Sequence, residues 1–171
     1  MKSLELYSKK DIEHLTRKRT NETKIGEDVS VLNSEKNWEV ELEKSSCKFV
    51  LLGIPEDVGV KANYGRGGAH TAWKPALDSF LSQQSNAFLN GKDICVLGHV
   101  FVEDLMEKSE SLQAKNKNDM VELRNLVSEI DKRVTDVISK IIEAKKIPIV
   151  IGGGHNNSYP IIKGCSLALH K

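Results

Sequence analysis

One stretch decides the fold: Ile147-Pro148-Ile149-Val150-Ile151-Gly152-Gly153-Gly154-His155. An apolar run without polar positions, ended by glycine, is typical of a strand that is buried on both faces of a parallel sheet. The glycines let the backbone turn sharply off the strand and present the histidine at the strand's carboxyl end. Open α/β sheets bind their ligands at that edge, so we expect a strand over residues 147–151 and a functional site beside His155.

Two further apolar runs precede this stretch, at residues 48–54 and residues 93–98. Between the runs lie apolar residues at helical spacing, over residues 73–81 and in a long stripe from Met120 to about residue 145. Residues 158–169 are expected to begin another helix. Alternation of strand and helix predicts an α/β fold with a parallel sheet and helices on both of its faces.

The first 45 residues are more polar than the rest of the chain. Residues 11–19 fit a short helix with Ile12 and Leu15 facing inward, while Trp38, Val40 and Leu42 alternate with charged residues. We interpret residues 1–45 as an extension that wraps the surface of a domain formed by residues 46–171.

Composition narrows the class of protein. The chain has 171 residues, 39% of them hydrophobic and 29% charged, with a formal net charge of +1. That balance suits one globular domain and disfavours nucleic-acid binding, which needs a basic surface. No run has the length of a membrane span, and the start lacks the apolar core of a signal peptide. With three cysteines and no CxxC pair, we expect a cytoplasmic protein that does not act on a membrane.

The glycine loop alone leaves several interpretations open. A neutral imidazole at a sheet edge is a good ligand for manganese, iron or zinc. The histidine would equally suit a tight turn in which it caps a helix or faces solvent. A nucleotide-binding module is a weaker alternative, because no GxxxxGK[ST] motif occurs and the glycines of residues 65–68 lack dinucleotide-binding spacing.

Four segments together resemble the ureohydrolases, the family of arginases, agmatinases and formimidoylglutamases. In chain order they are Leu51-Leu52-Gly53-Ile54-Pro55-Glu56-Asp57-Val58-Gly59, Asn63-Tyr64-Gly65-Arg66-Gly67-Gly68-Ala69-His70, Val96-Leu97-Gly98-His99 and Gly152-Gly153-Gly154-His155. The resemblance spans roughly residues 48–165 and is closest to bacterial formimidoylglutamases, since arginases more often have Asp where Gly154 stands.

The resemblance implies a three-layer arginase-like fold in which strand 48–54 is central among the three runs. It also implies two manganese ions bridged by a hydroxide that attacks the carbon of a formimino- or guanidino-amino acid, with His155 as one metal ligand. The family's remaining ligands lie in DAHxD and SxDxDxxDP motifs. The nine aspartates of this chain never fall as DxH, DxD or DxxD. We therefore expect an N-terminal half that is inactive alone, or a non-catalytic half-domain.

Other polar residues at the same edge have two interpretations each. His70 and His99 would line a substrate pocket or bond to loop backbone. Asn156 and Asn157 would shape the site or cap a helix. Arg66 would bind a substrate carboxylate or form an ion pair that fixes its loop.

Two further expectations concern an acidic loop and the sheet edge. Glu103 and Asp104 suit metal or acid–base chemistry by type, although a solvated loop is the simpler interpretation. Strand 147–151, without a partner on its far side, should leave Ile147, Ile149 and Ile151 on an open edge. We expect this edge to make the chain self-associate.

Overall fold

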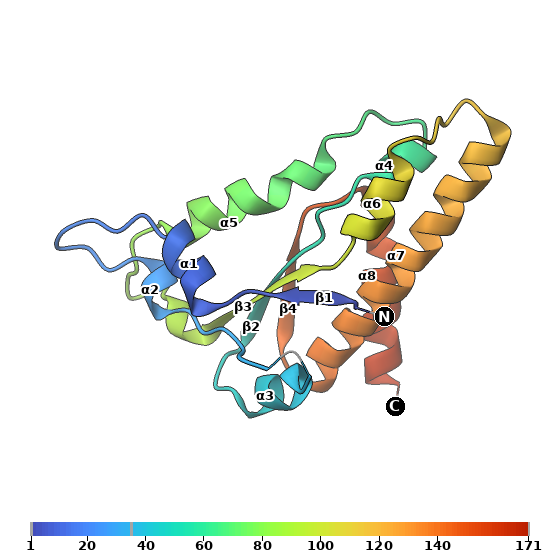
Figure 1. Cartoon of the computed structure of the whole chain (residues 1–171). Coiled ribbons are helices and arrows are strands. Elements are labelled where there is room, and N and C mark those ends of the chain that lie inside the picture. The colour runs from blue at the N-terminus through green and yellow to red at the C-terminus, as the bar shows by residue number, and fades with distance from the viewer. Residues whose placement is uncertain (1, 35, 171) are drawn as a thin grey trace.

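A single mixed sheet organises the computed structural model, which describes residues 2–34 and 36–170. Its four strands lie in the order β1-β3-β2-β4 (Figure 1). Their bounds are Leu4–Leu6 for β1, Phe49–Gly53 for β2, Ile94–Val100 for β3 and Ile147–Ile151 for β4. Strand β2 pairs in parallel with both β3 and β4. The three expected strands, and the central place of the first of them, are confirmed.

The remaining strand, β1, makes the sheet mixed rather than wholly parallel. It pairs antiparallel with β3, with Leu4 opposite Val100 and Leu6 opposite Gly98. The approach is close, because a Cβ at position 98 would lie 2.0 Å from the Glu5 carbonyl oxygen. Leu4-Glu5-Leu6 is too short for its alternation to stand out in the sequence.

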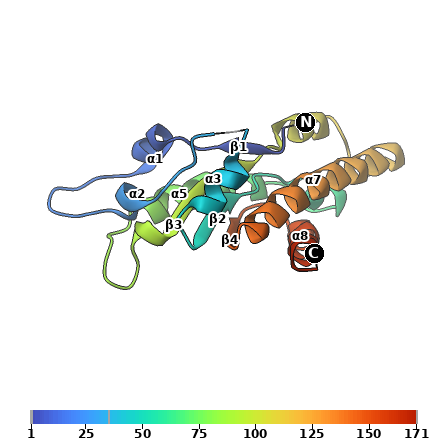
Figure 2. The same cartoon turned by 90° about the horizontal axis from the view of Figure 1, so that it is seen from below.

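Helices cover both faces of the sheet, as the α/β prediction required (Figures 1 and 2). Helices α3, α7 and α8 lie on one side, and α1, α2 and α5 on the other; α4 and α6 follow β2 and β3 at the carboxyl edge. Their bounds are Lys9–Leu15 for α1, Ile25–Asp28 for α2, Trp38–Lys44 for α3, Val58–Ala62 for α4, Trp73–Leu81 for α5, Glu103–Ser109 for α6, Lys117–Glu143 for α7 and Ser158–Leu169 for α8. Among the residues described, no helix is long and apolar enough to cross a membrane.

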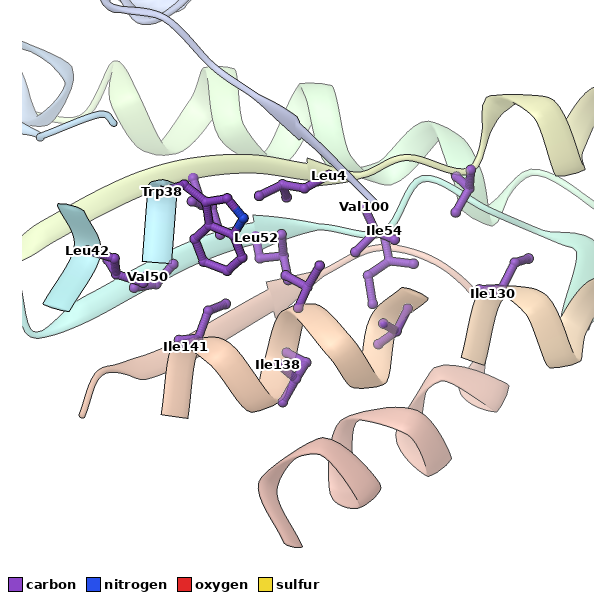
Figure 3. Packing of buried hydrophobic residues seen from close by; sticks show 14 of the residues in the cluster. Leu4, Trp38, Leu42, Val50, Leu52, Ile54, Val100, Ile130, Ile138 and Ile141 are labelled. Carbon is purple, nitrogen blue, oxygen red and sulfur yellow. The ribbon is translucent and has the colours of Figure 1, made fainter. Parts of the chain in front are cut away.

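The long helix α7 builds the core on its side of the sheet (Figure 3). Its fully buried Ile138 and Ile141 lie toward Val50 and Leu52 of β2, and Ile130 lies farther along the helix, on the side of Ile54. These helix positions recur at a spacing close to 3.6 residues, which places them on one face. Helix α8 packs on α7, where a Cβ at Gly164 would lie 2.8 Å from the Ile138 Cβ.

The core under α5 is anchored by Trp73, which is 1% exposed. Its ring lies on the backbone of β2, since a Cβ at Gly53 would come within 2.4 Å of it. The indole nitrogen of Trp73 donates a hydrogen bond of 3.0 Å to the Tyr7 hydroxyl. Tryptophan buried in this way has its polar atom satisfied.

The N-terminal segment contributes to both cores. Trp38 and Leu42, four residues apart in α3, are buried under α7, whereas Val40 between them is 48% exposed. Ile12 of α1 and Ile25 of α2 are fully buried on the α5 side. The helix expected over residues 11–19 occupies Lys9–Leu15 instead, because Ser8 and Asp11 form a capping box that starts it earlier. The described residues of this N-terminal segment therefore contribute to the core rather than only wrapping it.

Strand β4 is the open edge of the sheet. The Ile147 amide donates to the Lys48 carbonyl at 2.9 Å, and the Ile151 carbonyl accepts from the Ile54 amide at 3.0 Å. Odd-numbered residues of β4 thus direct their backbone groups to β2, and even-numbered residues direct theirs outward. Pro148 has no N–H, so Val150 carries the outward amide. The side chains of Ile147 and Ile149 are nevertheless 56% and 42% exposed.

We expect the chain to self-associate through this edge at tens of micromolar. Ile149→Lys should reduce the association, because a charge on an exposed edge strand opposes pairing with another chain. Val121→Lys is the matched control, since Val121 is 59% exposed but lies on α7. Light scattering provides the measurement. A monomer that is unaffected by either substitution would contradict the expectation.

Candidate functional site

Three loops meet at the carboxyl edge of the sheet, as the parallel arrangement predicts. They follow β2, β3 and β4; the first carries His70 and the third carries His155, while His99 lies within β3 itself, one residue before its end. Two carboxylates at the end of β2, Glu56 and Asp57, hold the first and third of these loops in place.

The loop after β4 depends on its glycines. Gly152 has φ of 99° and Gly153 has φ of 77°, conformations that residues with a side chain rarely adopt. Gly154 has an ordinary φ of −79°, but a Cβ there would lie 2.4 Å from Asn156 Oδ1. The loop therefore turns sharply off β4 and lets the side chains after it fold back beneath it.

Glu56 is the group beneath that loop. Its side chain is fully buried and accepts hydrogen bonds from the amides of Gly59 and Gly154, each at 3.1 Å. It also accepts from the side-chain nitrogens of Asn156 at 3.2 Å and Asn157 at 2.6 Å. A buried carboxylate is tolerated only when it is hydrogen-bonded in this way. Glu56 thus fixes the segment that presents His155.

The asparagines act differently from the capping role that we considered. Asn157 is the residue before α8 but makes no capping hydrogen bond. Its side chain instead bonds Glu56 and the Gly154 carbonyl. The role of Glu56 was not predicted from the sequence, because most of its hydrogen-bond partners lie about a hundred residues away. The one signal was an acidic residue shortly after a buried strand.

Asp57 holds the loop that follows α4. Its Oδ2 accepts from the Gly68 amide at 2.7 Å and from His70 Nδ1 at 2.8 Å. The Lys61 ammonium is 3.9 Å from Oδ1. Burial raises the pKa of Asp57, but these hydrogen bonds and the neighbouring charges outweigh it, and the pKa lies below its ordinary value. His70 is therefore oriented by a carboxylate, not by loop backbone.

The third histidine is bound in a similar way. His99 Nε2 lies 2.6 Å from Glu103 Oε1, and Glu103 also accepts from the Val102 amide. Burial raises the pKa of Glu103, but these bonds lower it below its ordinary value. Glu103 and Asp104 begin helix α6, and Asp104 pairs with the buried Arg133 at 2.6 Å. These two acids thus lie in a helix rather than in a loop, although the Glu103 side chain is 54% exposed to solvent.

His155 itself is exposed and borders a cavity of about 450 Å³, together with Val60, Asn63 and Asn156. Arg66 is also exposed, and within the described part of the chain it forms no ion pair that would fix its loop. Across residues 2–34 and 36–170, no three or more His, Cys, Asp or Glu side chains gather to hold a metal ion. Among the described residues that line this cavity, His155 is the only His, Cys, Asp or Glu side chain.

Comparison with known proteins identifies a family for this chain. Residues 47–171 match the family model described as the arginase family. No curated protein matches the chain. The matched region includes all three loops described above and begins just before β2.

Glu56→Gln should lower the free energy of unfolding by about 2 kcal/mol or more, because the introduced NH₂ group faces N–H donors and leaves some unpaired. Urea denaturation measures the change. Glu107→Gln is the control, because Glu107 is exposed on α6. A loss for Glu56→Gln no larger than that for the control would contradict the assigned role.

Asp57→Asn should cost stability in a pH-dependent manner. The pKa of Asp57 is lowered in the folded protein from an ordinary value of 3.8. The ionised side chain therefore contributes to the free energy of unfolding at pH values above 3.8. The contribution is lost as the pH falls through the folded pKa. The stability difference between wild type and Asp57→Asn should thus be full at pH 7 and shrink in acid. Asp78→Asn, which removes an exposed ion pair with Arg17, should show little difference at either pH.

Proposed function

The chain belongs to the arginase family of ureohydrolases, and from that premise we propose that His155 is one ligand of a manganese site for C–N bond hydrolysis. Three observations support the proposal. His155 lies at the carboxyl edge of the sheet, borders a cavity, and follows a glycine loop that Glu56 fixes. Such an edge is where open α/β sheets place their ligands.

The residues present do not fit a complete dinuclear centre. A pair of metal ions about 3.5–4 Å apart needs several carboxylate and imidazole ligands to hold a bridging hydroxide. The described residues bring together no group of three or more such side chains, and His155 supplies a single imidazole. We therefore propose that this chain alone is a non-catalytic half of a ureohydrolase site.

For the whole site we propose a formimino- or guanidino-amino acid as substrate, with the formimidoylglutamase type favoured. The support is local to Gly154. A side chain there would meet Asn156 Oδ1 at 2.4 Å and Val60 Cγ2 at 2.8 Å. An aspartate of the arginase type would thus displace Asn156, which bonds Glu56. A small amino-acid substrate, a cytoplasmic location and no part for nucleic acid or membrane complete the proposal.

The nucleotide-binding alternative has little support from the loops. A glycine loop binds phosphate through free backbone amides. Here the Gly154 amide donates to Glu56 and the Gly68 amide donates to Asp57. A phosphate at either loop would have to compete with a buried carboxylate for the same N–H group.

With manganese added, the chain should release no ammonia, formamide or urea from formimidoylglutamate, arginine or agmatine above a His155→Ala control. One imidazole cannot hold the nucleophile that the reaction needs. Product release by the wild type alone would show that the chain holds a working site and would overturn the half-site proposal.

The ligand role of His155 has a separate readout. Paramagnetic Mn²⁺ at millimolar concentration should broaden the ring signals of His155 before those of His14 and His170, since only His155 lies in the fixed loop. The dissociation constant should be on the order of 1 mM, as expected for one imidazole. If the ring signals of His155 broaden no more than those of His170, the assignment of His155 as a metal ligand is contradicted.

A further inference from the structure

A second cavity lies on the other side of the loop after β2. It has a volume of about 400 Å³ and shares no residue with the cavity beside His155. Small-molecule sites commonly fall in this size range and have mainly apolar walls with a few polar groups. Both features are present here.

The apolar walls are rigid. Trp73 and Tyr7 are 1% and 9% exposed, and their ring centroids lie 6.2 Å apart. The hydrogen bond between the Trp73 indole and the Tyr7 hydroxyl locks the pair, and Pro55 lines the same cavity. Such walls suit a flat apolar group, because aromatic pairs gain from stacked or edge-on contact.

The acidic group at this cavity is already occupied. Glu103 accepts from both the His99 ring and the Val102 amide. Part of its hydrogen-bonding capacity is therefore already used within the protein.

The basic groups are available instead. Asp57 holds His70 through Nδ1, which leaves Nε2 without a hydrogen-bond partner in the described part of the chain. Lys74 lines the cavity and, among the described residues, makes neither an ion pair nor a side-chain hydrogen bond. A lysine without a partner beside apolar walls favours an anionic head on an apolar body, whereas His70 Nε2 could donate to that head only from a doubly protonated ring.

We propose that this cavity binds a small aromatic monocarboxylate, with the ring against Trp73 and Tyr7 and the carboxylate at the Lys74 ammonium, beside His70. The site is independent of the metal proposal, because it shares no lining residue with His155. Asp57 is a positioning residue here, since it orients His70 without lining the cavity.

Benzoate is the probe, and the whole chain is titrated with it by NMR. The Trp73 indole N–H and the His70 ring signals should shift saturably, with a dissociation constant on the order of 1 mM for a ligand of this size. The Trp38 indole should not move, because Trp38 lies under α7. Benzyl alcohol, which has the same ring without the charge, should bind at least about tenfold more weakly, the factor that corresponds to one charge-assisted contact.

Lys74→Gln should weaken benzoate binding about fivefold to tenfold and leave benzyl alcohol unchanged. Lys48→Gln is the control, because Lys48 is an exposed lysine just before β2 that pairs with Asp93. Shifts that do not saturate by about 20 mM benzoate would overturn the cavity as a site. Equal binding of benzyl alcohol, or equal loss in both lysine variants, would overturn the carboxylate assignment.

Discussion

Two adjacent buried carboxylates impose the constraint on which this sheet edge depends. Glu56 and Asp57 follow β2 as consecutive residues, and both are buried. Each carboxylate therefore needs N–H donors from the protein in place of water. Glu56 finds its donors mainly in the loop after β4, and Asp57 finds them in the loop after α4. Each carboxylate therefore fixes a glycine-rich loop that has little apolar packing of its own.

This arrangement divides the functional edge in two. On the β4 side, Glu56 presents His155 to one cavity; on the β3 side, Asp57 presents His70 to another. The carboxylates that hold these two loops belong to consecutive residues, 56 and 57. Each of the two cavities thus depends on one residue of this dipeptide.

The sequence predicted the parts of the fold whose pattern is local. Strands β2, β3 and β4 and helices α5, α7 and α8 were visible as apolar runs and helical stripes. Strand β1 was missed because three residues carry no period, and the burial of Trp38 and Ile25 was missed because their partners lie in distant elements. The same reason hid the roles of Glu56 and Asp57. Glu56 bonds Asn157 across 101 positions of sequence, and nothing in either segment alone reports that contact.

Amide hydrogen exchange tests the role of the carboxylates most directly. If Glu56 and Asp57 hold the loops, the amides of Gly59, Gly154 and Gly68, which donate to them, should exchange at least about a hundredfold more slowly than an open loop amide. Gly67, an exposed neighbour in the same loop as Gly68, provides the comparison. Exchange of the Gly154 amide as fast as that of Gly67 would contradict the account, because it would show that the loop carrying His155 is not held by Glu56.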